Sequence, residues 1–240
     1  MPKVSKEYFD NKRKIILDAA LKVFSKKPSY TVSMKDIIKE SKLSHGGVYK
    51  YYSNIDDIII SLINRDKILV NPKDIIKNNY DYPEKAIFEF LEAYKNYFFE
   101  ATKEYGKIFF ELYPILINDK KRLKIYARKI SANINFAYWI ETLFIYFDKK
   151  INERYFNPIT TSQNIYMQIV SMLKGIEMEL ILTKYYNKNR DYKIDLETKL
   201  DDLVETIYKT ILFLMGSKIK NKEIWQQQNL SPLLNLVHRR

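Results

Sequence analysis

The sequence contains no cysteine and only two histidines, His45 and His238. Without cysteine, disulfides, thiolate metal ligands and cysteine nucleophiles are excluded. Two histidines so far apart in sequence make a histidine-rich metal site a poor prospect. The chain also lacks a nucleophile elbow, a glycine-rich phosphate loop and any metal-ligand spacing. We therefore expect no enzyme activity, no catalytic residues, no metal and no cofactor.

Glycine and proline are also scarce, with 5 and 7 residues respectively in a chain of 240. Turn signals are correspondingly rare, and long stretches of helical periodicity lie between them. A hydrophobic content of 46% and a charged content of 29% are typical of a globular protein. No internal repeat and no convincing strand alternation is found. The sequence therefore predicts an all-α fold.

Long hydrophobic runs are missing as well. The longest, such as residues 211–215, are far shorter than the about 18 apolar residues that a membrane span needs. The first residues lack the apolar core of a signal peptide. We expect a cytoplasmic protein with no membrane partner.

What the chain has in excess is positive charge, with a formal net charge of +12. Such a field attracts polyanions, whether DNA, RNA or an anionic membrane. A compositional bias is an equally good explanation of the charge alone, because lysine, isoleucine, asparagine and tyrosine are all abundant. Charge by itself therefore does not choose the partner.

Three short helices are predicted near the N-terminus. The first spans about residues 12–25 and ends before Pro28, which cannot continue a helix. The second begins at Ser33, whose hydroxyl caps the helix while Asp36 completes a capping box. It ends near Ser41, and a tight turn leads to a third helix over residues 44–52. Two short helices joined by a tight turn are typical of a helix-turn-helix.

The third helix has two distinct faces. Val48 and Tyr52 lie four residues apart and are expected to face the first two helices. The opposite face is expected to enter the major groove, where Gly46 and Gly47 let the backbone approach DNA. The hydroxyls and charges of the flanking residues are suited to phosphates. The predicted DNA-binding residues are Ser33, Lys35, Ser44, His45, Gly46, Gly47, Tyr49, Lys50 and Tyr51.

Over about residues 12–65 the chain resembles the TetR family of bacterial transcriptional regulators. Residues 33–38 resemble the second helix of that family, and residues 43–52 (Leu-Ser-His-Gly-Gly-Val-Tyr-Lys-Tyr-Tyr) resemble its turn and recognition helix. Three positions depart from the family pattern. Lys42 stands where a turn glycine is usual, Tyr52 where a phenylalanine is usual, and Ile55 where a lysine is usual, so a common phosphate contact is absent.

The rest of the chain is predicted to form longer helices. A fourth helix, predicted from Ser53 or Asn54 to about Leu69, connects the two parts. Further helices are predicted over residues 83–103, 107–117 (interrupted by Pro114), 120–149, 161–185 and 195–215. The expected division is a DNA-binding domain over residues 1–54, a connector over 55–69, and a helical regulatory and dimerisation domain over 70–240. That last domain includes an extra C-terminal tail from Ser217.

The resemblance implies a homodimer, and the last helix pair is the predicted interface because each helix has a long apolar stripe. Gly175 offers a place for close helix approach. Filling the core of a monomer is the alternative role of these stripes. The predicted interface residues are Ile169, Leu173, Ile176, Leu180, Leu203, Ile207 and Ile211.

The resemblance also implies a small-molecule effector, and the aromatic middle helices suit an apolar or aromatic one. Core packing is an equally suitable role for these aromatics. Arg128 or Lys129 is a candidate contact for an anionic ligand, although a solvated face explains both. Glu111 and Glu141 are interpreted as helical surface charges. The predicted effector-binding residues are Phe88, Phe109, Phe110, Tyr113, Tyr138 and Trp139.

The sequence thus predicts a transcription regulator that binds a double-stranded DNA operator as a homodimer, acting as a repressor that a small molecule releases. An activator without ligand gating, or a nucleoid-associated helical protein, is the first alternative. A basic helical protein of the membrane surface is the second. Sequence-selective duplex binding separates the regulator from both.

Overall fold

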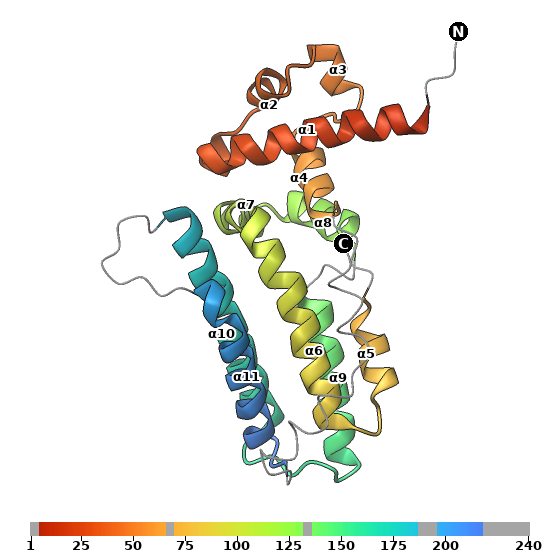
Figure 1. Ribbon diagram of the computed structural model, residues 1–240, viewed down its shortest axis with the longest axis vertical. Helices are drawn as coiled ribbons and strands as arrows, with labels where there is room; N and C mark the ends of the chain where they lie inside the picture. The colour runs from red at the N-terminus through yellow and green to blue at the C-terminus, as the bar shows by residue number, and fades with distance from the viewer. Residues whose placement is uncertain (1–4, 66–69, 132–135, 187–195, 218–240) are drawn as a thin grey trace.

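The computed structural model describes residues 5–65, 70–131, 136–186 and 196–217. Over these residues the fold is all-helical, which confirms the predicted class (Figure 1). Of the described helices, none combines the length and the hydropathy that crossing a bilayer requires. In chain order the elements are α1 (Lys6–Lys26), the 3₁₀ turn η1 (Ser29–Thr31), α2 (Met34–Ser41), α3 (His45–Tyr49), α4 (Ile55–Ile63), α5 (Pro72–Asn78), α6 (Pro83–Tyr94), the π-helical turn η2 (Lys95–Phe99), α7 (Glu100–Asn118), α8 (Lys120–Lys129), α9 (Phe136–Asn152), α10 (Ser162–Ile181), the π-helical turn η4 (Leu182–Tyr186) and α11 (Leu196–Leu214).

The helices form two groups along the long axis of the molecule. Figure 1 shows α1, α2 and α3 at one end, with α1 lying across the axis. Helix α4 leads from this group towards a body in which α6, α7, α9, α10 and α11 run roughly along the axis (Figure 1). Helix α3 therefore lies at the extreme end of the molecule, away from most of the body.

The hydrophobic core is also divided in two, but not at residue 54. One cluster joins α1–α4 with side chains from α7 and α8, including Tyr105, Ile108 and Tyr126. The other lies in the body and is centred on fully buried residues such as Phe90 and Trp139. Because α7 contributes to the first cluster, the N-terminal helices share a core with the body and do not pack as an isolated unit.

Helix α1 begins earlier than the sequence suggested. The hydroxyl of Ser5 accepts a hydrogen bond from the backbone N–H of Tyr8, so Ser5 caps a helix that starts at Lys6. The apolar stripe is as expected, because Ile16, Ala20 and Phe24 are buried. The N-terminal extension brings Phe9 close to Lys50 and Tyr51, which directly follow α3.

Two predicted helices are one continuous rod. Helix α6 passes through the π turn η2 into α7, which runs to Asn118 with Pro114 inside it. The expectation that Pro114 interrupts this region is therefore wrong. Proline removes only one backbone hydrogen bond, and Pro114 is exposed in the last turns of the helix, where few such bonds follow.

The single helix predicted over residues 120–149 is also wrong. It is two helices, α8 and α9, because the backbone becomes extended at Ile130 (φ −80°, ψ 133°). No proline or glycine marks this break. Instead, α8 is held on α4 by contacts described below, and that tertiary attachment sets its direction.

The last helix pair agrees closely with its predicted bounds, whereas the short helix α5 was not predicted. Gly175 does not mediate close approach within the chain, since an added Cβ would have no neighbour within 4 Å. Gly106 of α7 does, because an added Cβ there would lie 2.9 Å from Cγ1 of Ile181. The tight contact thus joins α7 to α10.

Candidate nucleic-acid interface

Helix α2 begins with the capping box that the sequence predicts. The Ser33 hydroxyl lies 3.4 Å from the backbone nitrogen of Asp36, and the backbone N–H of Ser33 donates to the Asp36 carboxylate at 3.0 Å. Lys27 also donates to this carboxylate, at 2.5 Å. The Lys27 hydrogen bond, followed by those from Ser33, lowers the pKa of Asp36 to about 2. The start of α2 is therefore fixed by reciprocal bonds and tied to the end of α1.

The turn between α2 and α3 depends on one residue. Lys42 has φ 56° and ψ 22°, which places it in the left-handed region. Glycine occupies that region without steric cost, whereas a side chain brings its Cβ close to the backbone. Lys42 thus adopts, with a side chain, a conformation that favours glycine.

Helix α3 presents the two faces that were predicted. Ser44 caps it by accepting a hydrogen bond from the backbone N–H of Gly47 at 3.1 Å. Val48 is fully buried and Tyr52 is 5% exposed, so both anchor the helix to the first core cluster. His45, Gly46, Tyr49 and Lys50 are exposed. The helix is short, ending at Tyr49, with residues 50 and 51 in turns.

The exposed aromatic and basic side chains of this face are partly ordered by one another. The rings of His45 and Tyr49 stack with centroids 4.3 Å apart. The Lys50 ammonium lies 5.0 Å from the centre of the Phe9 ring. Tyr51 is half-buried, 6.0 Å from the same ring, with the Arg13 guanidinium 5.9 Å from its centre. Pre-ordered side chains lose less conformational entropy when they bind.

Two of these residues, Phe9 and Arg13, were missed in the sequence. The sequence feature that could have revealed them is Ser5, because it caps the extra first turns of α1 and so places both residues beside Tyr51. The remaining predicted residues have local roles. The hydroxyls of Ser33 and Ser44 cap helices, Gly47 donates its N–H to one of them, and Lys35 is exposed on α2.

Helix α4 is held on its body side by α8. The Arg122 guanidinium donates to both carboxylate oxygens of Asp56, at 2.6–3.1 Å, and the Tyr126 hydroxyl donates to the same carboxylate at 2.6 Å. Burial tends to raise the pKa of Asp56, but these hydrogen bonds outweigh it and hold the pKa below its usual value. Lys129 pairs with Asp57 at 2.9 Å. The connector is therefore fixed to the body by charged hydrogen bonds.

A second attachment joins the end of α1 to α7. The buried Lys107 ammonium donates to the backbone carbonyls of Phe24 (2.8 Å) and Lys27 (2.6 Å), and to Glu111 at 3.2 Å. Glu111 in turn accepts the backbone N–H of Ser29. Burial raises the pKa of Glu111, but hydrogen bonds from Ser29 and Tyr186 hold it below its usual value. We call these contacts the α1–α7 joint.

The α1–α7 joint corrects one interpretation. Glu111 is not a solvated surface charge, because its side chain is only 10% exposed and is paired with Lys107. Glu141 is exposed, in line with its interpretation. Lys129 is engaged with Asp57, while Arg128 is exposed.

An open groove of about 500 Å³ lies beside α1, α4 and the end of α8. Arg13, Tyr51, Asn64 and Lys129 contribute to its walls. None of the six predicted effector-binding residues lines it.

The predicted effector-binding residues are not brought to one place. Trp139 is fully buried among Phe90 and other rings in the body cluster. Phe88 and Tyr138 pack at the margin of that cluster, whereas Phe109 packs on the other cluster. Phe110 lies against Tyr186, and Tyr113 is 60% exposed. The reason is that α6, η2 and α9 contribute to the body cluster, whereas α7 contributes to the first cluster, so the predicted residues face different surroundings.

Most of the predicted interface residues pack inside the chain's own hydrophobic core. Five of them are buried in the core of the body, and Ile176 and Leu203 are partly buried against it. Side chains enclosed by their own chain are not available to a partner. The buried five are Ile169, Leu173, Leu180, Ile207 and Ile211. The outer faces of the same helices expose other apolar side chains, namely Tyr166, Met167, Met178 and Phe213. The C-terminal tail after Ser217 lies outside the described residues.

A capped helix, a tight left-handed turn and a second helix anchored by Val48 and Tyr52 define a helix-turn-helix module, the architecture of a large class of DNA-binding proteins. Residues 16–62 of the chain match the family model described as "Bacterial regulatory proteins, tetR family". The chain is 42% identical over 62 residues to the uncharacterized HTH-type transcriptional regulator YfiR of Bacillus subtilis. That match covers 26% of this chain and 30% of YfiR, so it spans less than a third of either protein.

Solved structures extend the similarity in fold to most of the chain. A crystal structure of HlyIIR, a hemolysin II transcriptional regulator, aligns with a TM-score of 0.54 at 19% identity, covering 87% of this chain and 99% of HlyIIR. NalD of Pseudomonas aeruginosa, the secondary repressor of the MexAB-OprM multidrug efflux pump, aligns with a TM-score of 0.54 at 16% identity, covering 85% and 97%. At these identities the likeness concerns the fold.

Proposed function

We propose that the protein is a transcription regulator that binds a double-stranded DNA operator as a homodimer and acts as a repressor released by a small, largely apolar or aromatic effector. The observation that supports DNA binding most directly is the outer face of α3. Val48 and Tyr52 fix the helix from within, and His45, Tyr49 and Lys50 remain exposed beside the N-terminal amides of the helix. A helix presented in this way fits the major groove. Because the proposed partner is chromosomal DNA, the proposed place of action is the cytoplasm.

The proposed DNA-binding residues divide by role. His45, Gly46 and Tyr49 are on the face that would meet base edges. Lys50, Tyr51 and Lys35 are placed to reach phosphates, while the capping residues Ser33 and Ser44 and the close-packed Gly47 support the backbone. Ile55 at the start of α4 supplies no charge, so the phosphate contacts would depend on α2, α3 and the first turns of α1.

The decisive experiment is binding of the purified protein to the intergenic DNA upstream of its own gene, with a scrambled duplex as competitor, over a range of salt concentrations. We expect selective binding with a steep loss of affinity as salt rises. Tyr49→Ala and Lys50→Ala should each weaken binding without changing the melting temperature. Tyr82→Ala is the matched control, because Tyr82 is exposed at the start of α6, and α6 begins at the end of the body that is remote from α3 (Figure 1). Equal affinity for both duplexes would instead favour the nucleoid-associated alternative.

For the effector, the proposed place is the body cluster around Trp139, which offers the aromatic surroundings that an apolar ligand prefers. The Tyr97, Phe98 and Phe90 rings lie 5.2–6.3 Å from the Trp139 ring, centre to centre. Since Trp139 is fully buried, a ligand there has to displace packed side chains. The test is a screen for compounds that both change tryptophan fluorescence and weaken operator binding. A broad screen in which no compound alters operator affinity would favour regulation without a ligand.

A further inference from the structure

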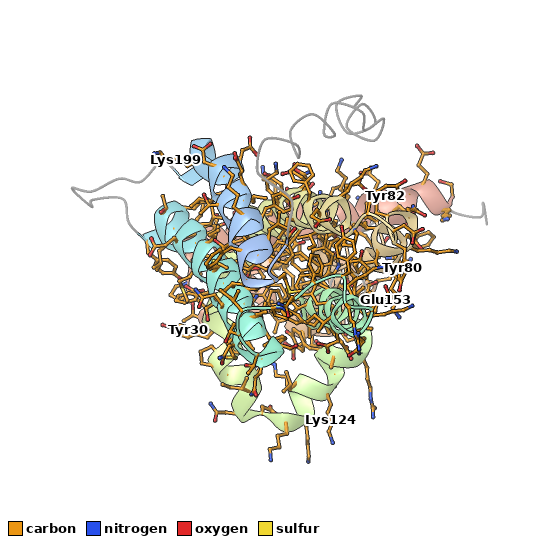
Figure 2. The ribbon with its side chains drawn as sticks, turned by 90° about the horizontal axis from the view of Figure 1, so that it is seen from below. Tyr30, Tyr80, Tyr82, Lys124, Glu153 and Lys199 are labelled. Atoms are coloured by element: carbon orange, nitrogen blue, oxygen red, sulfur yellow. The ribbon has the colours of Figure 1, made fainter. Side chains whose placement is uncertain are left out.

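The end of α7 and the whole of α8 form a helical hairpin that projects from the body. In Figure 2 this hairpin lies at the lower edge of the molecule, and Lys124 is at its outer limit, pointing away from the other helices. The hairpin has two sides with different occupants. Its inner side holds α4 through Arg122, Tyr126 and Lys129, as described above. Its outer side carries side chains that are exposed among the residues the structure describes.

The outer side of α8 is strongly basic. Four cationic side chains are exposed there, and within the described residues no ion pair engages any of them, in contrast to Arg122 and Lys129 on the inner side. Three of the four are spaced at intervals of four residues, so they follow one line along the helix. We call these four residues, Lys120, Lys121, Lys124 and Arg128, the α8 basic strip.

Exposed aliphatic side chains lie in the same hairpin as the α8 basic strip. Of the seven valine, leucine and isoleucine side chains that are exposed in the described chain, four lie within residues 115–125. Ile117 at the end of α7 is 47% exposed and Ile125 in α8 is 46% exposed. The exposed fractions of Ile115 and Leu123 are slightly lower, at 39% and 37%. Such clustering within so short a segment is unusual for scattered surface residues and marks an interaction surface.

We propose that the outer side of the α7–α8 hairpin docks on an anionic lipid surface. Aliphatic side chains among lysines suit this partner, because the apolar groups enter the boundary of the headgroups while the long basic side chains reach the lipid phosphates. A nucleic acid backbone or an acidic protein matches the charge, but phosphates and carboxylates offer nothing to four exposed aliphatic groups. The proposal goes beyond DNA binding and departs from the expectation that the protein has no membrane partner.

The test is co-sedimentation of the full chain with vesicles. We expect binding to vesicles of phosphatidylcholine mixed with phosphatidylglycerol and none to vesicles of phosphatidylcholine alone. Each cation near an anionic surface is worth about a fivefold change in partitioning. Lys120→Gln with Lys124→Gln should therefore reduce binding about 25-fold. The matched control, Lys77→Gln with Lys199→Gln, removes two exposed cations from α5 and α11 and should change it little.

The aliphatic groups are tested separately. Ile117→Ser with Ile125→Ser should also reduce binding severalfold, whereas Ile145→Ser with Ile159→Ser, at positions 61% and 58% exposed elsewhere, should not. Circular dichroism checks that all four variants are folded. The proposal is overturned if the wild-type chain ignores anionic vesicles, or if the control lysine pair matters as much as the strip. It is also overturned if the isoleucine pair is neutral, since that result indicates a partner that reads charge alone. Operator binding, measured on the same samples, reports on the proposed function independently of these outcomes.

Discussion

At the scale of single residues, Lys42 is the position where the local sequence and the required backbone disagree. Its φ of 56° is needed to turn from α2 into α3, yet a lysine Cβ makes that conformation costly by about 1–2 kcal/mol. Glycine removes this cost. However, glycine has more conformational freedom in the unfolded chain, and this offsets about 0.5–1 kcal/mol of the stabilisation. The difference leaves a modest net gain.

We therefore expect Lys42→Gly to raise the free energy of unfolding by about 0.5 kcal/mol. Lys39→Gly is the matched control, because Lys39 is exposed in the helical conformation of α2. There the same substitution should lower stability by about 1 kcal/mol. Urea unfolding of the two variants beside wild type measures both. Changes of the same sign would mean that the turn is not strained by lysine.

The Asp36 carboxylate predicts how the stability of the protein depends on pH. Its pKa is about 2 in the folded chain against an ordinary value of 3.8. The stabilisation from its bonds to Lys27 and Ser33 is therefore complete above pH 4 and is lost as the pH falls from about 4 to about 2. Asp36→Ala should cost about 1 kcal/mol at neutral pH and progressively less below pH 4. Thermal unfolding of both proteins from pH 7 to pH 2 provides the measurement, and a constant gap between them would contradict the assignment.

Much of this residue-level detail could be predicted. The Ser33 cap, the inward orientation of Val48 and Tyr52, and the exposure of Tyr49 all follow from local rules of spacing and capping. Ser5 was available as a signal and was overlooked. The buried pairing of Glu111 could not be predicted, because its partner atoms on Ser29 come from 82 positions earlier in the chain and a charge at helical spacing looks the same whether solvated or buried.

At the scale of elements, the α1–α7 joint combines two kinds of helix-end contact. Lys107 supplies a positive charge to the carbonyls that end α1, and Glu111 supplies a negative charge to the N–H of Ser29 at the start of η1. Each satisfies backbone groups that a helix end leaves unpaired. The rod formed by α6, η2 and α7 is thereby attached to the N-terminal helices.

Lys107→Met should lower the free energy of unfolding by about 3 kcal/mol, because it leaves the Glu111 carboxylate buried without its cation. The double variant Lys107→Met with Glu111→Leu should be less destabilised than the sum of the two single variants, since neither partner is then stranded. Denaturant unfolding of the four proteins of this cycle gives the coupling energy. Simple additivity would show that the pair does not interact.

The attachment of α8 to α4 leads to a second prediction at this scale. Arg122→Ala should lower stability by about 2 kcal/mol, because it removes charged hydrogen bonds from a half-buried Asp56. Arg128→Ala, an exposed position on the same helix, should have an effect below about 0.5 kcal/mol. The shift in melting temperature of each variant measures the two effects. Equal shifts would indicate that Arg122 contributes only through helix propensity.

The predicted bounds agree best with the structure where local signals at the helix ends were used, although the caps at Ser5 and Asn71 were not recognised. Helices α2, α10 and α11 were close to their expected bounds because caps or loops mark them. The break between α8 and α9 has no proline or glycine, so only the contact of α8 with α4 explains it. Pro114 led to the opposite error, a predicted interruption where the helix continues, because an exposed proline near the end of a helix is tolerated.

At the scale of the whole molecule, the outer faces of α10 and α11 remain the proposed dimer interface. Phe213 is 69% exposed on α11, which is high for a phenylalanine in a folded chain. We expect Phe213→Glu to shift the protein towards monomer and to weaken operator binding. Ile145→Glu, at a position 61% exposed on α9, is the control and should leave both unchanged. Sedimentation velocity and operator titration provide the readouts. A dimeric Phe213→Glu protein would place the interface elsewhere.

The overall architecture was predictable, but the choice of residues for contacts between chains was not. Periodicity correctly placed apolar stripes on the last helix pair. It could not tell which side of a two-sided apolar helix faces its own core, and the buried side was chosen for the interface. The predicted effector-binding aromatics are divided for a related reason, because spacing along a helix does not reveal which of the two cores that helix packs in.

The π-helical turn η2 lies between the two halves of the α6–α7 rod. Relative to an α-helix, such a turn accommodates one extra residue, and each residue of helix corresponds to a rotation of about 100°. Removing a single exposed residue there, such as Asn96, would let the π turn close into an ordinary α-helical turn, and α6 and α7 would keep nearly the same relative rotation. A one-residue deletion between Lys95 and Phe99 should therefore leave Lys107 at the end of α1. The same deletion in the regular helix of residues 100–106 would turn the rest of α7 by about 100° and carry Lys107 away, so η2 is the part of this rod where a change of length is tolerated.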